Sequence, residues 1–274
     1  MNAADVDSSG LHLYYDAIHN YGAHTNMNPA AYEEQNTIRW NHTDTAGNIR
    51  LSMVAGLFEE TAAAHIEKRG VGFEALQERG EVWVLSRMYI NITRYPSWGE
   101  TVTVRTWPKG VDRLFALRDF LIVDSTGAPV IGASSAWILI DLKSRRPKRL
   151  ESMLSNFVCD PDTHAVDRSP AALAINGTSE YEETVTAQYA DMDLNGHVNN
   201  ARYIDWSFNA MPQTLFGTHE AKTFEINYLA EAVWKDSITV RRMRLSDEAY
   251  GIEAYNGTKA VFRSRTDFWP RAAQ

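Results

Sequence analysis

Two stretches of the chain repeat one pattern of apolar and polar positions. Each begins with a short alternating segment and a turn, continues as an apolar helix and ends in several alternating segments. Helical spacing of apolar residues predicts a helix from about residue 48 to 69, with Gly70 as its C-cap. The second helix is expected from about residue 198 to 210, started by Asn199 or Asn200. A long helix followed by antiparallel strands indicates an α+β fold whose curved sheet wraps the helix.

The two copies are related by matching anchor segments. The turn DTAGNI at residues 44–49 resembles DLNGHV at 193–198, and WGETVTV at 98–104 resembles WKDSITV at 234–240. The spacing between matching anchors shrinks along the chain, so the first copy carries extra residues after its helix. The segment EKRGVGFEALQERG is the expected place for them.

This repeat predicts the domain organisation. Residues 31–150 are expected to form the first unit and residues 179–274 the second. Residues 151–178 contain two prolines and many polar side chains, which is typical of a linker. Residues 1–30 are interpreted as an N-terminal extension.

Composition narrows the class of protein. Of the 274 residues, 44% are hydrophobic and 23% charged, which is typical of a globular protein. The longest nearly apolar stretch, residues 130–140, is much shorter than the ~20 residues of a membrane-spanning helix. The first ten residues do not resemble a signal or transit peptide, so a cytoplasmic protein is expected. A net charge of −8 argues against general binding of nucleic acid.

Basic residues nevertheless cluster in the segment LKSRRPKRL. One interpretation is ordinary solvated charge, and the other is a docking patch for an acidic partner, since local potential steers association. The candidate docking residues are Lys143, Arg145, Arg146, Lys148 and Arg149.

The segment DMDLNGHVNN holds the main candidates for chemistry. Asp193, Asn195 and His197 alternate with other residues, which would direct their side chains to one side of an extended segment. A helix begins directly afterwards, so backbone N–H groups and a positive dipole end would lie close by. Backbone N–H groups near His197 and Val198, with the Asn195 amide, are expected to polarise a substrate carbonyl. Capping of the helix alone would also favour Asp and Asn here.

Comparison of the copies favours the chemical interpretation. At matching positions the first copy has Asp44, Ala46 and Asn48, so the amide and the imidazole of this segment are specific to the second copy. Glu231, just before the strand that Trp234 opens, is a candidate general base, and its counterpart in the first copy is a tyrosine.

Three segments resemble the family of plant and bacterial acyl-acyl carrier protein (acyl-ACP) thioesterases. They are DMDLNGHVNNARYIDW, VWVLSRMYINITRYPSWGETVTVRTWP and THEAKTFEINYLAEA, and the resemblance runs from about Tyr32 to near Trp269. It implies a tandem (double) hotdog fold, with catalysis in the second hotdog and an acyl pocket in the first. The family's functional residues then fall on Asp193, Asn195, His197 and Glu231.

The resemblance also implies the reaction, which is hydrolysis of fatty acyl-ACP to free fatty acid and carrier protein. The expected partner is an acidic carrier protein with a phosphopantetheine arm. The acyl chain is expected between the first helix and its sheet, with Met53, Leu57 and Trp83 as candidate wall residues, although each of them taken singly is more often an ordinary core residue. Two questions stay open: whether the protein forms a homodimer, and whether Glu231 or His197 is the general base.

One position departs from the family pattern. Many members have Cys directly after the catalytic Glu, where this chain has Ala232, and its single cysteine, Cys159, lies in the predicted linker. A Cys-His nucleophile pair is therefore not expected near the motif. The eight histidines lack metal-ligand spacing, and no phosphate-binding or dinucleotide motif occurs, so no metal or cofactor is expected.

Two other functions remain as alternatives. An acyl-CoA thioesterase would share the fold and the chemistry, and turnover on the two carriers separates it from an acyl-ACP thioesterase. A non-catalytic acyl-binding hotdog protein would bind without hydrolysis, and it would leave the asymmetry between the copies unexplained.

Overall fold

The computed structural model describes residues 30–150 and 158–271. The N-terminal extension predicted for residues 1–30 lies outside the described residues except for its last position. Among the described residues, no helix is long and apolar enough to cross a membrane.

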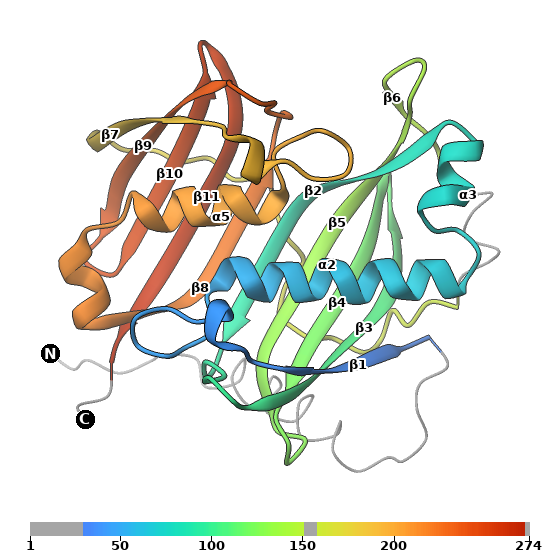
Figure 1. The fold of residues 1–274 in the computed structure, drawn as a ribbon, viewed down its shortest axis with the longest axis horizontal. Helices are drawn as coiled ribbons and strands as arrows, with labels where there is room; N and C mark the ends of the chain where they lie inside the picture. Colours follow the sequence, from blue (N-terminus) through green and yellow to red (C-terminus); the bar gives the residue numbers. More distant parts are fainter. Residues whose placement is uncertain (1–29, 151–157, 272–274) are drawn as a thin grey trace, which may run out of the picture.

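The first copy contains one long helix, one short helix and six strands (Figure 1). Helix α2 ends where the sequence predicts, because Gly70 adopts a φ of 70° that suits a C-cap glycine. Helix α3 occupies the extra segment of this copy. The elements are β1 (Tyr32–Thr37), α2 (Leu51–Lys68), α3 (Phe73–Glu78), β2 (Glu81–Ile92), β3 (Thr101–Asp112), β4 (Phe115–Val123), β5 (Pro129–Asp141) and β6 (Arg146–Pro147).

The second copy repeats this order with a shorter helix. Three short 3-10 helices accompany the two copies, at Trp40–His42, Tyr189–Asp191 and Gln213–Gly217. The elements of the second copy are β7 (Ser179–Thr186), α5 (Asn200–Asn209), β8 (His219–Tyr228), β9 (Ser237–Ser246), β10 (Ala249–Asn256) and β11 (Lys259–Pro270).

All the strands belong to one antiparallel sheet. Its order is β1-β3-β4-β5-β2-β8-β11-β10-β9-β7, with β6 paired to β5. Strands β2 and β8 join the two copies, with Met88 opposite Ile226 and Ile90 opposite Phe224. All four of these side chains are fully buried, so the junction between the copies is part of the core.

The helices α2 and α5 lie side by side on one face of the sheet (Figure 1). Alternation along β4 shows how the sheet divides its side chains between two faces. Phe120 belongs to the main core and stacks on Phe58 of α2 at 4.8 Å between ring centroids. Its neighbour Leu121 faces the other side, where it packs with Trp107 and Ala165.

The predicted linker is fastened to that opposite face. It has no helix or strand in its described part, residues 158–178, but buried side chains of the sheet bind its backbone. The N–H groups of three linker residues donate to three sheet side chains: Ala165 to Asp119 at 3.0 Å, Ala171 to Glu225 at 2.8 Å and Leu173 to Asn227 at 2.7 Å. Buried acceptors without partners are costly, so these contacts hold the linker in place.

Candidate active site

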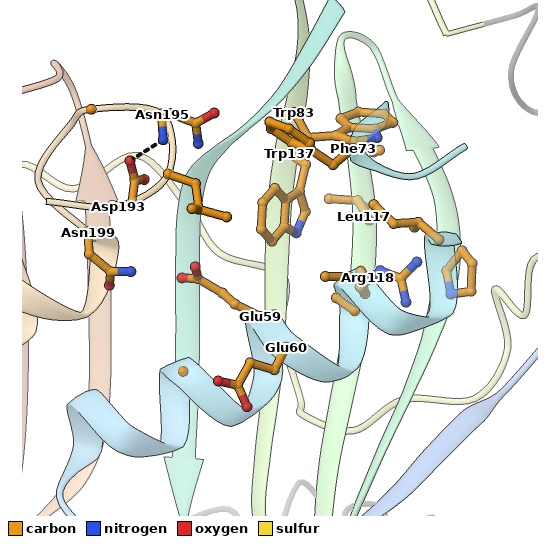
Figure 2. Close-up of a pocket in the computed structure, with 18 of the residues that line it drawn as sticks. Glu59, Glu60, Phe73, Trp83, Leu117, Arg118, Trp137, Asp193, Asn195 and Asn199 are labelled. Atoms are coloured by element: carbon orange, nitrogen blue, oxygen red, sulfur yellow. Dashed lines mark hydrogen bonds between the residues drawn. The ribbon is translucent and has the colours of Figure 1, made fainter. Parts of the chain in front are cut away.

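A tight turn, rather than an extended segment, brings the polar residues of the second copy together. Asp193 Oδ1 accepts the backbone N–H of Asn195 at 2.8 Å and of His197 at 3.2 Å (Figure 2). Gly196 supplies the φ of 75° that the turn requires. The expected extended conformation was therefore wrong, because the Asp193 carboxylate folds the backbone around itself.

The first copy contains the same turn. Asp44 Oδ1 accepts the N–H of Ala46 at 2.8 Å and of Asn48 at 3.1 Å, and Gly47 has a φ of 79°. The aspartate thus shapes the turn in both copies. The functional side chains found only in the second copy are the amide of Asn195, the imidazole of His197 and the carboxylate of Glu231.

A backbone hydrogen bond brings this turn to Glu231. The N–H of Val198 donates to the carbonyl of Ala232 at 2.8 Å, and the corresponding bond in the first copy joins Ile49 to Pro96 at 2.9 Å. As a result, His197 Nε2 lies 3.4 Å from Glu231 Oε2. The imidazole and the carboxylate are therefore adjacent, although the chain separates them by a helix and a strand.

The first copy has no such pair. Tyr95 occupies the position of Glu231, one residue before the bonded carbonyl, and its hydroxyl donates to the carbonyl of Ala221 at 3.1 Å. Asn48 occupies the position of His197, and its side-chain amide donates to Glu220 at 3.2 Å. These groups are committed to structural hydrogen bonds, so the imidazole–carboxylate pair exists only in the second copy.

Arg145 from the first copy also reaches Glu231. Its guanidinium donates to Oε2, the same oxygen that faces His197. Lys148 pairs with Glu81 inside the first copy. The predicted docking patch therefore does not act as one free cluster, because two of its residues bind carboxylates of this chain. Lys143 and Arg146 are exposed on the β5–β6 hairpin.

The N-terminus of α5 lies next to the turn. Asn199 caps the helix by accepting the N–H of Ala201 at 2.9 Å, as the sequence predicts. The N–H groups of His197 and Val198 are already bonded to Asp193 and Ala232, so they are not available as oxyanion donors. That expectation was wrong. The N–H groups of Asn199 and Ala201 are bonded as well, so the groups that remain are the Asn195 side-chain amide and the dipole of α5.

A cavity of about 1110 Å³ runs between α2 and the strands of the first copy and reaches the turn (Figure 2). This volume is at the upper end for small-molecule sites. Trp83 lines the cavity, as do Asp193, Asn195 and Asn199. His197 and Glu231 lie at its rim, outside the lining.

Two of the three candidate wall residues are elsewhere. Leu57 is buried in the main core, and Met53 packs against that core, so neither lines the cavity. Both lie on a helix that is wrapped on most sides, and helical spacing alone does not distinguish its core face from its cavity face.

Three charged residues that sequence reasoning missed also line the cavity, Glu59 and Glu60 from α2 and Arg118 from β4 (Figure 2). The Arg118 guanidinium donates to His65 Nδ1 at 3.2 Å and to Thr106 Oγ1 at 3.1 Å. Burial lowers the pKa of Arg118 to about 10, and burial with the nearby Arg118 charge lowers the pKa of His65 to about 4. In the sequence, the signal that could have identified these residues was a charged side chain within an otherwise apolar run.

Cys159 lines the same cavity, and the N–H of the next residue, Asp160, donates at 2.9 Å to the carbonyl of Pro108, which also lines it. Burial raises the pKa of its thiol, which reduces its reactivity as a nucleophile. Within residues 30–150 and 158–271, no group of three or more His, Cys, Asp or Glu side chains is placed to hold a metal ion.

Fold and site together define a tandem hotdog protein with an imidazole–carboxylate pair at the rim of a large cavity. The sequence profile "Acyl-ACP thioesterase N-terminal domain" matches residues 29–156, and "Acyl-ACP thioesterase C-terminal domain" matches residues 176–261. The chain therefore belongs to the acyl-ACP thioesterase family.

Individual relatives agree with this assignment. An acyl-ACP thioesterase structure from Bacteroides thetaiotaomicron superposes with a TM-score of 0.81 at 29% identity, covering 88% of this chain and 98% of that one. The 12:0-ACP thioesterase of Umbellularia californica shares the fold, with a TM-score of 0.80 at 24% identity, covering 90% of this chain and 100% of that one.

Curated sequences also match the chain. Oleoyl-acyl carrier protein thioesterase 2 of Arabidopsis thaliana is 27% identical over 76% of this chain. The match covers 61% of that relative, so the chain spans about three fifths of its length.

Proposed function

We propose that this chain hydrolyses fatty acyl-ACP thioesters, releasing a free fatty acid and the carrier thiol. The observation that carries the proposal is the His197–Glu231 pair, 3.4 Å apart at the rim of a cavity large enough for an acyl chain. The first copy has the same fold but lacks this pair. The fold therefore does not require the pair, which supports a chemical role for it in the second copy.

The thioester carbonyl is assigned to the N-terminus of α5. There the Asn195 amide and the helix dipole stabilise the negative charge that develops on the carbonyl oxygen. Because Arg145 and His197 both contact Oε2 of Glu231, we assign the attacking water to Oε1. Asp193 takes no part in proton transfer, since its carboxylate holds the turn.

Proton transfer then uses the two adjacent groups. Glu231 accepts a proton from the water that attacks the carbonyl carbon and passes it to His197, which delivers it to the sulfur as the carbon–sulfur bond breaks. The products are a carboxylic acid and a thiol. The acyl chain extends from the rim into the cavity between α2 and the sheet, along Trp83.

Docking of the carrier is assigned to the surface around the β5–β6 hairpin. This hairpin carries the exposed Lys143 and Arg146 and brings Arg145 to Glu231. An acidic carrier bound there would place its arm at the rim of the cavity.

The test is to incubate the purified protein with a panel of acyl-ACPs and the matching acyl-CoAs, and to measure free acids by mass spectrometry. Release from the carrier protein at a higher kcat/KM than from CoA supports the proposal. Preference for CoA would make the chain an acyl-CoA thioesterase, and binding without hydrolysis would make it an acyl-binding protein.

A further inference from the structure

Glu59 is a carboxylic acid placed where the acyl cavity meets the reaction centre. It lies on α2 and lines the cavity (Figure 2). Its Oε2 accepts a hydrogen bond from the side chain of Asn200 at 3.3 Å, and Asn200 is the first residue of α5. Glu59 is therefore next to the helix end to which the thioester carbonyl is assigned.

One oxygen of this carboxyl group has no partner. Oε1 is buried and makes no hydrogen bond within the described residues. A buried polar atom without a partner is costly, and such atoms in native proteins call for an explanation. An unsubstituted hydrocarbon chain in the cavity could not form a hydrogen bond with this oxygen, whereas a chain that carries an oxygen substituent could.

The proton of Glu59 is held more tightly than that of an ordinary glutamate. Burial is the main cause that raises its pKa to about 7, and the nearby charges of Asp193 and Glu60 raise it further, while the Asn200 bond lowers it. Tyr228, whose own pKa is raised by burial and by Glu59, is the other titratable group close to it. Near neutral pH the group therefore exists both as a hydrogen-bond donor and as an acceptor.

We propose that Glu59 hydrogen-bonds an oxygen substituent of the acyl chain close to the thioester, so that the chain favours 3-hydroxy- and 3-oxoacyl thioesters over unsubstituted ones. This inference rests on the proposed function, because it uses the same carbonyl position. The atoms that follow the carbonyl carbon pass Glu59 before they reach the apolar part of the cavity around Ile66 and Val111.

The experiment compares kcat/KM for 3-hydroxy-, 3-oxo- and unsubstituted acyl-ACPs of equal chain length. The proteins are the wild type, Glu59→Gln, Glu59→Leu and, as a matched control, Glu78→Gln at an exposed position of α3 outside the cavity lining. The wild type and the control are expected to prefer the 3-hydroxyacyl substrate by about tenfold or more, as one hydrogen bond to an ionisable group provides. Glu59→Leu is expected to reduce this ratio to about one.

The pH dependence separates donor from acceptor. A 3-oxo group only accepts hydrogen bonds, so the wild type should lose its preference for the 3-oxoacyl substrate as pH rises from 6 to 8. Glu59→Gln retains an N–H donor and should keep that preference at both pH values. Equal ratios in the wild type and Glu59→Leu, or the same pH dependence in Glu59→Gln, would overturn the inference.

A binding measurement separates this inference from the proposed function. Non-hydrolysable pantetheine amides with and without a 3-hydroxyl group can be titrated calorimetrically into the same four proteins. Tighter binding of the hydroxylated amide, lost in Glu59→Leu, supports the role of Glu59 even if no thioester is hydrolysed. Hydrolysis without any such difference in binding would leave the proposed function standing and refute the role of Glu59.

Discussion

Replacing Glu59 by glutamine should make the stability of the protein respond differently to pH. Because the pKa of Glu59 rises from 4.5 to about 7 on folding, the folded state binds its proton more tightly than the unfolded chain does. The stability that this provides is fully present below pH 4.5 and is lost as pH rises through 7. A shift of this size in the pKa corresponds to about 3.5 kcal/mol, at about 1.4 kcal/mol per pKa unit.

The variant removes this dependence without removing the bond to Asn200, since the glutamine oxygen can still accept it. The free energy of unfolding of Glu59→Gln relative to the wild type should therefore increase by about 2.5 kcal/mol between pH 5 and pH 8. Urea unfolding at four pH values in this range measures the difference. The exposed Glu78 on α3 provides the control, and Glu78→Gln should stay within about 0.5 kcal/mol of a constant offset. A constant offset for Glu59→Gln as well would refute the buried, protonated state.

Three further changes test other parts of the molecule. Arg145→Gln should lower kcat on acyl-ACP by up to about fivefold, as expected for the loss of an exposed ion pair. The control variant Arg146→Gln, at a residue that makes no contact with Glu231, should leave kcat unchanged. Equal effects of the two variants would contradict a role for the Arg145–Glu231 contact. Cys159→Ser should hydrolyse acyl-ACP within about twofold of wild type, and loss of activity would revive a thiol mechanism. A Cβ at Gly132 would lie 2.2 Å from a carbonyl oxygen of the linker, so Gly132→Ala should destabilise the protein by about 1–3 kcal/mol in urea unfolding. Gly217→Ala, where a Cβ meets nothing within 4 Å, should change stability by less than about 1 kcal/mol, and equal effects would show that the linker is not docked there.

The internal repeat allowed much of the fold to be predicted. Matching turns and tryptophans located the two helices to within a few residues and identified the segment that became α3. They also indicated that Glu231 corresponds to Tyr95, and equivalent backbone hydrogen bonds relate these two positions in the structure. Local patterns sufficed here because each copy repeats the same turn, cap and strand order.

Contacts between distant parts of the chain could not be predicted in this way. The hydrogen bonds of the linker to Asp119 and Glu225 depend on which side chains face the back of the sheet. The reach of Arg145 to Glu231 depends on how the two copies pair through β2 and β8. Neither the basic cluster nor the polar linker has a periodic sequence pattern from which its contact partners in the fold could be predicted.

The side chains of the cavity were hidden for a related reason. Glu59 follows Phe58 on a helix that the core, the cavity and α5 surround, so apolar spacing marks burial without saying which neighbour each residue meets. The same ambiguity placed Met53 and Leu57 in the predicted wall, although the structure packs them in the core.

The most direct test of the central claim is a double-mutant comparison of His197 and Glu231 in acyl-ACP hydrolysis. If the two groups act as one acid–base unit, His197→Gln and Glu231→Gln should each lower kcat by about 10²–10⁴-fold, and the double variant should be little worse than either. Near-normal turnover by either single variant, or fully multiplicative losses in the double variant, would contradict the account.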